Sequence, residues 1–252
     1  MVLALRCLLM GAVLALGLGG CAQAPVTTAS AVRPPPAAVA PAVPPEVASG
    51  AVSSAQWAKD MAEFAAQDAA HPPPRDAVLF IGSSSIRKWT TLAQDFPGTA
   101  VINRGFGGSE VRDSTYYADR IVVPYKPRMV VFYAGDNDLN SGRSVQQVVQ
   151  DTFAFITRIR QDLPDVPVVY ISIKPSPSRA ALLPKIGQAN AQIAQRAAQL
   201  KNVYFVDVFT PMLGADGQPR AELFEPDMLH MKPEGYALWT ELLRPYVTTG
   251  PH

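Results

Sequence analysis

The chain has 252 residues, with 22 Lys and Arg against 21 Asp and Glu, so its net charge is close to zero. It contains neither a basic stripe nor an acidic tail, which argues against nucleic acid as a partner. Its two cysteines, Cys7 and Cys21, both lie near the start, which excludes a disulfide framework in the rest of the chain.

The first 20 residues have the pattern of an export signal. They carry one charge, Arg6, and an apolar run. This run is too short for a spanning helix, and no stop-transfer charges follow it. The run ends in Leu18-Gly19-Gly20-Cys21, which resembles the lipobox of bacterial lipoproteins and implies acylation of Cys21. The alternative is an ordinary signal peptide with a chance cysteine. We expect a lipid-anchored envelope protein, and Ala22 favours the outer membrane, facing the periplasm.

The sequence divides into three parts. The signal peptide covers 1–20, and the acylated cysteine with its tether covers 21–52. The tether is dominated by Ala, Pro, Val, Thr and Ser, has no helical or strand period, and is expected to be semi-extended. The remaining residues, 53–249, suit one domain with a sizeable core.

Within this domain, predicted helices alternate with short apolar strands. Apolar runs predict buried strands at 78–81, 100–102, 129–133, 168–173 and 203–206. Amphipathic patterns predict helices at 53–70, 85–94, 110–121, 144–163, 184–200 and 234–246. Ser144 and Gln147 are expected to form a capping box. Strands that are apolar on both faces indicate a parallel sheet covered on both sides.

Three serines, Ser83-Ser84-Ser85, stand between the first strand and its helix, directly after Gly82. A serine there lies at the carboxyl end of a strand, where open α/β sheets bind their ligands. The helix start also offers free N–H groups to a developing oxyanion. The alternative is that these serines merely cap the helix, which is the commoner role for serine at such a position.

A base for such a serine would be a histidine, and the chain has three. His71 lies in a proline-rich turn and His252 is the last residue, which leaves His230 inside the folded part. Asp227 precedes it by three residues, so in a turn its carboxylate can reach the imidazole Nδ1–H and support the imidazolium. A loop histidine that only caps backbone groups is the alternative.

Two further strand ends carry groups that could hold an oxyanion. Gly135-Asp136-Asn137-Asp138 follows the strand at 129–133, and Asn137 places an amide donor at the same edge as Ser84. Gly105-Phe106-Gly107-Gly108 follows the strand at 100–102, where a glycine N–H can point into a site. Both segments could equally serve only as turns.

Taken together, these four stretches resemble the SGNH (GDSL-type) esterase superfamily, which has Ser, Gly, Asn and His in four blocks in this order. Matched residue by residue, the nucleophile is Ser84, the backbone oxyanion donor Gly108, the side-chain oxyanion donor Asn137, the base His230 and the acid Asp227. The resemblance extends from about Ala77 to Trp239. Gly82-Ser83-Ser84 stands where the family has Gly-Asp-Ser, and Ser84 keeps the family's spacing from Gly82.

The resemblance implies a three-layer α/β/α sandwich, flavodoxin-like, with about five parallel strands and no metal or cofactor. It also implies hydrolysis of esters or thioesters through an acyl-enzyme. The oxyanion hole would consist of the N–H groups of Ser84 and Gly108 and the Asn137 amide.

We expect a serine esterase that removes small acyl groups, acetyl in particular, from an envelope-associated substrate. The motif-bearing loops are short, and the connections at 174–183 and 210–229 do not have the pattern of an amphipathic lid. The alternatives are a lysophospholipase or thioesterase of the same family, or a non-catalytic envelope-binding module on the same fold. The expected partners are the acyl ester and, through the anchor, the membrane. Nothing in the sequence indicates an oligomeric state.

Overall fold

The computed structural model describes residues 56–250. The predicted signal peptide, Cys21, the tether at 21–52 and His252 lie outside the described residues. Within the described part, no helix has both the length and the apolar character needed to cross a membrane.

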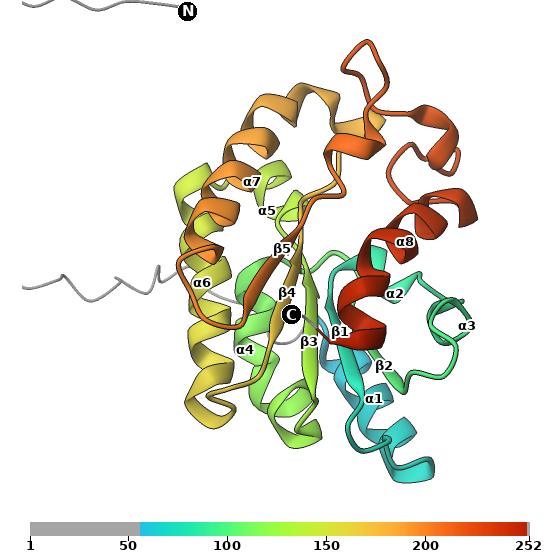
Figure 1. The fold of residues 1–252 in the computed structure, drawn as a ribbon, viewed down its shortest axis with the longest axis vertical. Coiled ribbons are helices and arrows are strands. Elements are labelled where there is room, and N and C mark those ends of the chain that lie inside the picture. The colour runs from blue at the N-terminus through green and yellow to red at the C-terminus, as the bar shows by residue number, and fades with distance from the viewer. Residues whose placement is uncertain (1–55, 251–252) are drawn as a thin grey trace, which may run out of the picture. The chain divides into compact units, whose positions relative to one another are not determined.

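The core of the fold is one sheet of five parallel strands in the order β2-β1-β3-β4-β5 (Figure 1). The strands are β1 Val78–Gly82, β2 Val101–Gly105, β3 Met129–Tyr133, β4 Val168–Ile171 and β5 Val203–Val206. This is the flavodoxin-like order. Gly82 at the end of β1 pairs with the last residues of β2 and β3, so the carboxyl ends of these three strands lie at one edge.

Helices cover both faces of the sheet, because alternate strand residues point to opposite sides. Leu79 and Ile81 belong to one core, and Val78 and Phe80 belong to the other. The first core is closed by α1 Ala58–Ala70, α4 Val111–Ile121, α6 Val145–Asp162 and α7 Leu183–Ala197. The second is closed by α2 Ser84–Arg87, α3 Leu92–Asp95 and α8 Pro233–Thr249 (Figure 1). The expected α/β/α sandwich is confirmed.

The single helix predicted over 85–94 is wrong, because the chain forms the two short helices α2 and α3 instead. The Asp95 carboxylate accepts hydrogen bonds from Trp89 Nε1, at 2.6 Å, and from the Thr91 hydroxyl, at 2.7 Å. These side-chain bonds favour a local turn over a continuous helix. The Trp89 ring is buried against Tyr236 and Trp239 of α8.

Other boundaries differ from the predicted ones by a few residues, and the Ser144–Gln147 capping box is confirmed, with bonds of 3.2 and 2.9 Å. A short helix, α5 Asp136–Asn140, forms where the sequence indicated a turn. The longer connections contain 3₁₀ helices, at Val123–Tyr125, Pro177–Leu182, Thr210–Met212 and Ala221–Leu223.

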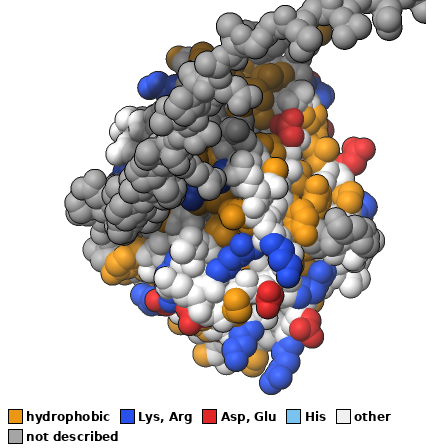
Figure 2. Space-filling view, turned by 60° about the vertical axis from the view of Figure 1, so that its left-hand side comes forward, with side chains coloured by type: hydrophobic (Ala, Val, Ile, Leu, Met, Phe, Trp, Pro, Cys, Tyr) orange, Lys and Arg blue, Asp and Glu red, His pale blue; other side chains and the backbone are white. Residues whose placement is uncertain are grey.

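The outer surface of the helices carries charges of both signs. Arg158 of α6 pairs with Asp119 of α4 and with Asp162 on its own helix. On the face that Figure 2 shows, Lys and Arg side chains lie among Asp and Glu side chains. Exposed pairs of this kind contribute little stability, so the fold depends mainly on its two apolar cores.

Candidate active site

Ser84 lies at the carboxyl edge of the sheet, where β1 turns abruptly into α2. Gly82 makes this turn possible with a φ of +141°, and a Cβ built on it would lie 1.8 Å from the carbonyl oxygen of Tyr133 on β3. Only glycine fits such a close approach. The N–H of Ser83 then donates to that same carbonyl at 3.0 Å, and Ser84 begins α2.

The structure distinguishes the three serines from one another. Ser83 and Ser85 are buried, and within residues 56–250 their hydroxyls have no hydrogen-bond partner. Ser84 is partly exposed, and its Oγ lies 3.0 Å from His230 Nε2. Ser84 is therefore the serine of the run whose hydroxyl meets the histidine.

His230 and Asp227 share one tight turn, ahead of α8. Asp227 Oδ2 lies 2.5 Å from His230 Nδ1, and its Oδ1 accepts the N–H groups of Leu229 and His230 at 3.0 and 2.9 Å. Met228, between them, has a φ of +55°. The bond from the His230 side chain, supported by these backbone N–H groups, holds the pKa of Asp227 well below its usual value. The carboxylate therefore stays ionised and faces Nδ1.

Asn137 and Gly108 lie on adjacent loops at the same edge. Asn137 is the second residue of α5, and its Nδ2 donates to the carbonyl of Ser109 at 3.0 Å. Gly108, the residue before Ser109, is exposed and has a φ of +80°. A Cβ would meet nothing there, so this backbone conformation, not lack of space, is what favours glycine at position 108.

Buried charges lie behind Asn137, and the sequence reasoning missed them. Arg179 Nη2 donates to Asn137 Oδ1 at 2.8 Å, and its Nη1 lies 3.0 Å from Asp136 Oδ2. Lys174 Nζ lies 3.1 Å from the same carboxylate oxygen and 3.3 Å from the hydroxyl of Tyr133. A signal for them is present in the sequence, since a lysine and an arginine closely follow an apolar strand, but this connection was considered only as a possible lid.

The buried charges in this cluster compensate one another. Burial alone would raise the pKa of Asp136, but Lys174 and Arg179 outweigh that effect and leave its pKa below the usual value. Burial lowers the pKa of the Lys174 ammonium, and Asp136 opposes that change. A buried charge is tolerated when it is paired in this way.

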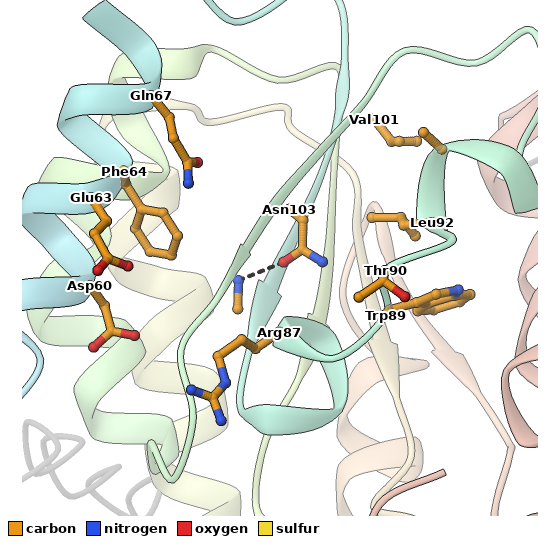
Figure 3. Close-up of a pocket in the computed structure, with 12 residues that line it drawn as sticks. Asp60, Glu63, Phe64, Gln67, Arg87, Trp89, Thr90, Leu92, Val101 and Asn103 are labelled. Atoms are coloured by element: carbon orange, nitrogen blue, oxygen red, sulfur yellow. Dashed lines mark hydrogen bonds between the residues drawn. The ribbon is translucent and has the colours of Figure 1, made fainter. Parts of the chain in front are cut away.

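A groove of about 400 Å³ lies over the edge strand β2, between α1 and the α2–α3 segment (Figure 3). Asn103 lies between the α1 side chains and Thr90 in this view. Its Oδ1 accepts the N–H of Gly105 at 2.9 Å, and its Nδ2 donates to the carbonyl of Ile86 on α2 at 2.7 Å. Asn103 thus supports the short helix that begins with Ser84. The residues that line the groove include neither Ser84 nor His230.

In the part of the chain that the structure describes, no three His, Cys, Asp or Glu side chains are grouped so that they could hold a metal ion. The side chains gathered at the sheet edge are a hydroxyl, an imidazole, a carboxylate and a carboxamide. Such a set is suited to acyl transfer by a serine nucleophile with a histidine base.

Comparison with known proteins gives a consistent result. Residues 79–238 match the model of the GDSL-like lipase/acylhydrolase family. No curated protein sequence matches the chain at a significant level.

Several solved structures share the fold at low sequence identity. A protein from Streptococcus pneumonia assigned as a platelet activating factor is 22% identical, with a TM-score of 0.67 over 75% of this chain and 91% of its own. A GDSL-like lipase from Bacteroides thetaiotaomicron is 22% identical, with a TM-score of 0.65 over 74% and 96%. A mutant acetyl esterase with an acetate ion is 18% identical, with a TM-score of 0.52 over 67% and 94%.

Proposed function

Because the chain belongs to the GDSL-like lipase/acylhydrolase family, and is thus a hydrolase of ester bonds, we propose that it is a serine esterase that removes small acyl groups with Ser84 as nucleophile. The observation that carries this proposal is the continuous chain of contacts from Asp227 through His230 to Ser84. A module that only bound a ligand would not need all three groups in this order.

The contacts support the following mechanism. With its Nδ1–H donated to Asp227, His230 presents a free Nε2 lone pair to the Ser84 hydroxyl. Ser84 Oγ attacks the ester carbonyl carbon while His230 takes its proton, and the imidazolium then protonates the departing alcohol. Water, activated by His230 in turn, hydrolyses the acyl-enzyme and releases the acid and free Ser84.

The negative charge of the tetrahedral intermediate needs donors in fixed positions. We assign this role to the N–H groups of Ser84 and Gly108 and to Asn137 Nδ2. The Asn137 amide has two hydrogens, and the bond to Ser109 uses one of them, which leaves the other for the oxyanion. Loss of one such donor typically costs about 3 kcal/mol of transition-state stabilisation.

The loops around the site favour a small acyl group. In the described residues, the connection between β5 and α8 holds only two three-residue 3₁₀ helices, which are too short to form an amphipathic lid. Long-chain lipases need an extended apolar groove, often under a mobile lid. The acetyl esterase of similar fold is a further reason to favour acetyl esters. For a protein tethered in a bacterial envelope, acetylated glycans are the substrate class that we propose.

The acyl preference is tested with the 53–252 fragment on nitrophenyl esters of increasing chain length. We expect kcat/KM to be highest for acetate or propionate and to fall by octanoate, because a short open site offers no contact to a long chain. A profile that rises toward long chains would instead indicate a lysophospholipase. Absence of hydrolysis across the whole series would favour the envelope-binding module.

We also propose that acyl chains on Cys21 anchor the enzyme in the envelope, a proposal that rests on the sequence alone. The Cys21→Ser variant should move from the membrane fraction to the soluble fraction of the cell, because it can no longer carry the acyl chains that would hold the protein in the membrane. Cys7→Ser is the matched control, and its fractionation should equal that of the wild type. Unchanged membrane fractionation of Cys21→Ser would refute the anchor.

A further inference from the structure

The segment that follows β4, Lys174–Arg179, contacts two parts of the site that lie on different loops. At its end, the Arg179 guanidinium reaches the Asn137 carboxamide. One residue earlier, the N–H of Ser178 donates to the carbonyl of Met228 at 3.0 Å, inside the turn that carries Asp227 and His230. The segment therefore joins the amide donor to the turn that holds the base.

The two ends of a carboxamide have nearly the same shape but opposite hydrogen-bonding character. Rotation of the Asn137 amide by 180° would place its oxygen, an acceptor, where an oxyanion must be held. Two contacts oppose this rotation. Arg179 can only donate, at 2.8 Å, and the Ser109 carbonyl can only accept, at 3.0 Å. In a rotated amide, the NH₂ group would face the Arg179 donor and the oxygen would face the Ser109 carbonyl, so both hydrogen bonds would be lost.

Arg179 is itself held in place. Its side chain is 10% exposed, and its Nη1 lies 3.0 Å from Asp136 Oδ2. Lys174, 1% exposed, reaches the same oxygen and the Tyr133 hydroxyl. A planar guanidinium that is paired on one side can present its other side in one orientation only. The cluster thus offers Asn137 a fixed donor.

We propose that Arg179 is a positioning residue for ester hydrolysis, which fixes the Asn137 carboxamide with Nδ2 available to the oxyanion. This inference rests on the proposed function of Asn137 as an oxyanion donor. Arg179 acts through Asn137 and does not touch the reacting atoms.

The experiment is a double-mutant cycle on nitrophenyl acetate with Arg179→Ala, Asn137→Ala and the double variant. We expect Arg179→Ala to lower kcat about tenfold or more, up to the roughly 10²- to 10³-fold loss of a missing oxyanion donor, with little change in KM. In the Asn137→Ala background, the same substitution should change kcat by less than about threefold, because there is no amide left to orient.

Two further variants keep the test decisive. Arg179→Lys retains a cation near Asp136 and should fold well, but one ammonium cannot match both partners of the guanidinium, so kcat should still fall. This variant carries the cycle if Arg179→Ala does not fold. Arg158→Ala, in an exposed ion pair on α6, is the matched control and should leave kcat and KM unchanged.

Equal losses of kcat from Arg179 substitution in both backgrounds would overturn the inference, as would unchanged kcat in Arg179→Lys and Arg179→Ala. These outcomes leave the proposed function intact, provided that turnover still depends on Ser84. A wild-type protein without esterase activity, or an Asn137→Ala variant as active as the wild type, would overturn the premise and the inference with it.

Discussion

The Ser84→Ala variant should fold like the wild type and lose esterase turnover by about 10⁴-fold or more. Among residues 56–250, the hydroxyl makes one hydrogen bond, to His230 Nε2, and the Ser84 side chain caps no helix. Its removal therefore costs about 1 kcal/mol of stability at most. Steady-state kinetics on nitrophenyl acetate, together with a thermal melt, separate these two effects.

Ser83→Ala and Ser85→Ala are the matched controls for this prediction. Their hydroxyls are buried without partners in the described structure, so their loss removes an unsatisfied polar group and leaves the site in place. Both variants should keep most of the activity and be as stable as the wild type. An inactive Ser83→Ala or Ser85→Ala protein that is fully folded would show that the alignment with the first family motif is shifted by one residue, so that Ser84 is not the nucleophile.

The second large effect is expected at His230. His230→Ala removes the base, so kcat should fall by about 10⁴-fold or more with the fold intact. The turn should persist, because Asp227 still accepts the backbone N–H groups of Leu229 and residue 230. Asp227→Asn should also lower kcat, by about tenfold or more, since an amide cannot stabilise the imidazolium as a carboxylate does.

His71→Ala is the control for the histidine prediction. His71 is exposed and follows α1, outside the site, so its loss should change neither kcat nor the melting temperature. Comparison of His71→Ala with His230→Ala separates the loss of a specific base from any general effect of removing an imidazole. Normal turnover in a folded His230→Ala variant would refute the assignment.

The strands and the gathering of polar groups at one edge could be predicted from the sequence. A run such as Met129–Tyr133 is buried on both faces in the structure. Its sequence predicted this, because apolar and polar residues do not alternate along it. Because parallel strands end at one level, residues after different strands come together. Ser84 is far from His230 in the sequence, and the two side chains still lie within hydrogen-bond distance.

The features that escaped prediction depend on contacts between distant residues or on particular side-chain bonds. The helix predicted over 85–94 is interrupted by side-chain hydrogen bonds to Asp95. The spacing of apolar residues, on which that prediction rested, gives no information about such bonds. Lys174 and Arg179 are buried only because Asp136, on another strand end, pairs with both. A charged residue after a strand is usually solvated, so the composition of this connection predicted only a loop and not a buried cluster.

The measurement that tests the central claim most directly is covalent labelling of the active protein with a nitrophenyl phosphonate, followed by peptide mass mapping. An activated serine attacks the phosphorus atom, nitrophenolate leaves, and the phosphonyl group stays bound to the serine, so it marks the nucleophile itself. We predict one label per chain, on Ser84, in parallel with the loss of activity, and no label on His230→Ala under the same conditions. A label on Ser83 or Ser85, or full inhibition with Ser84 unmodified, would contradict the account.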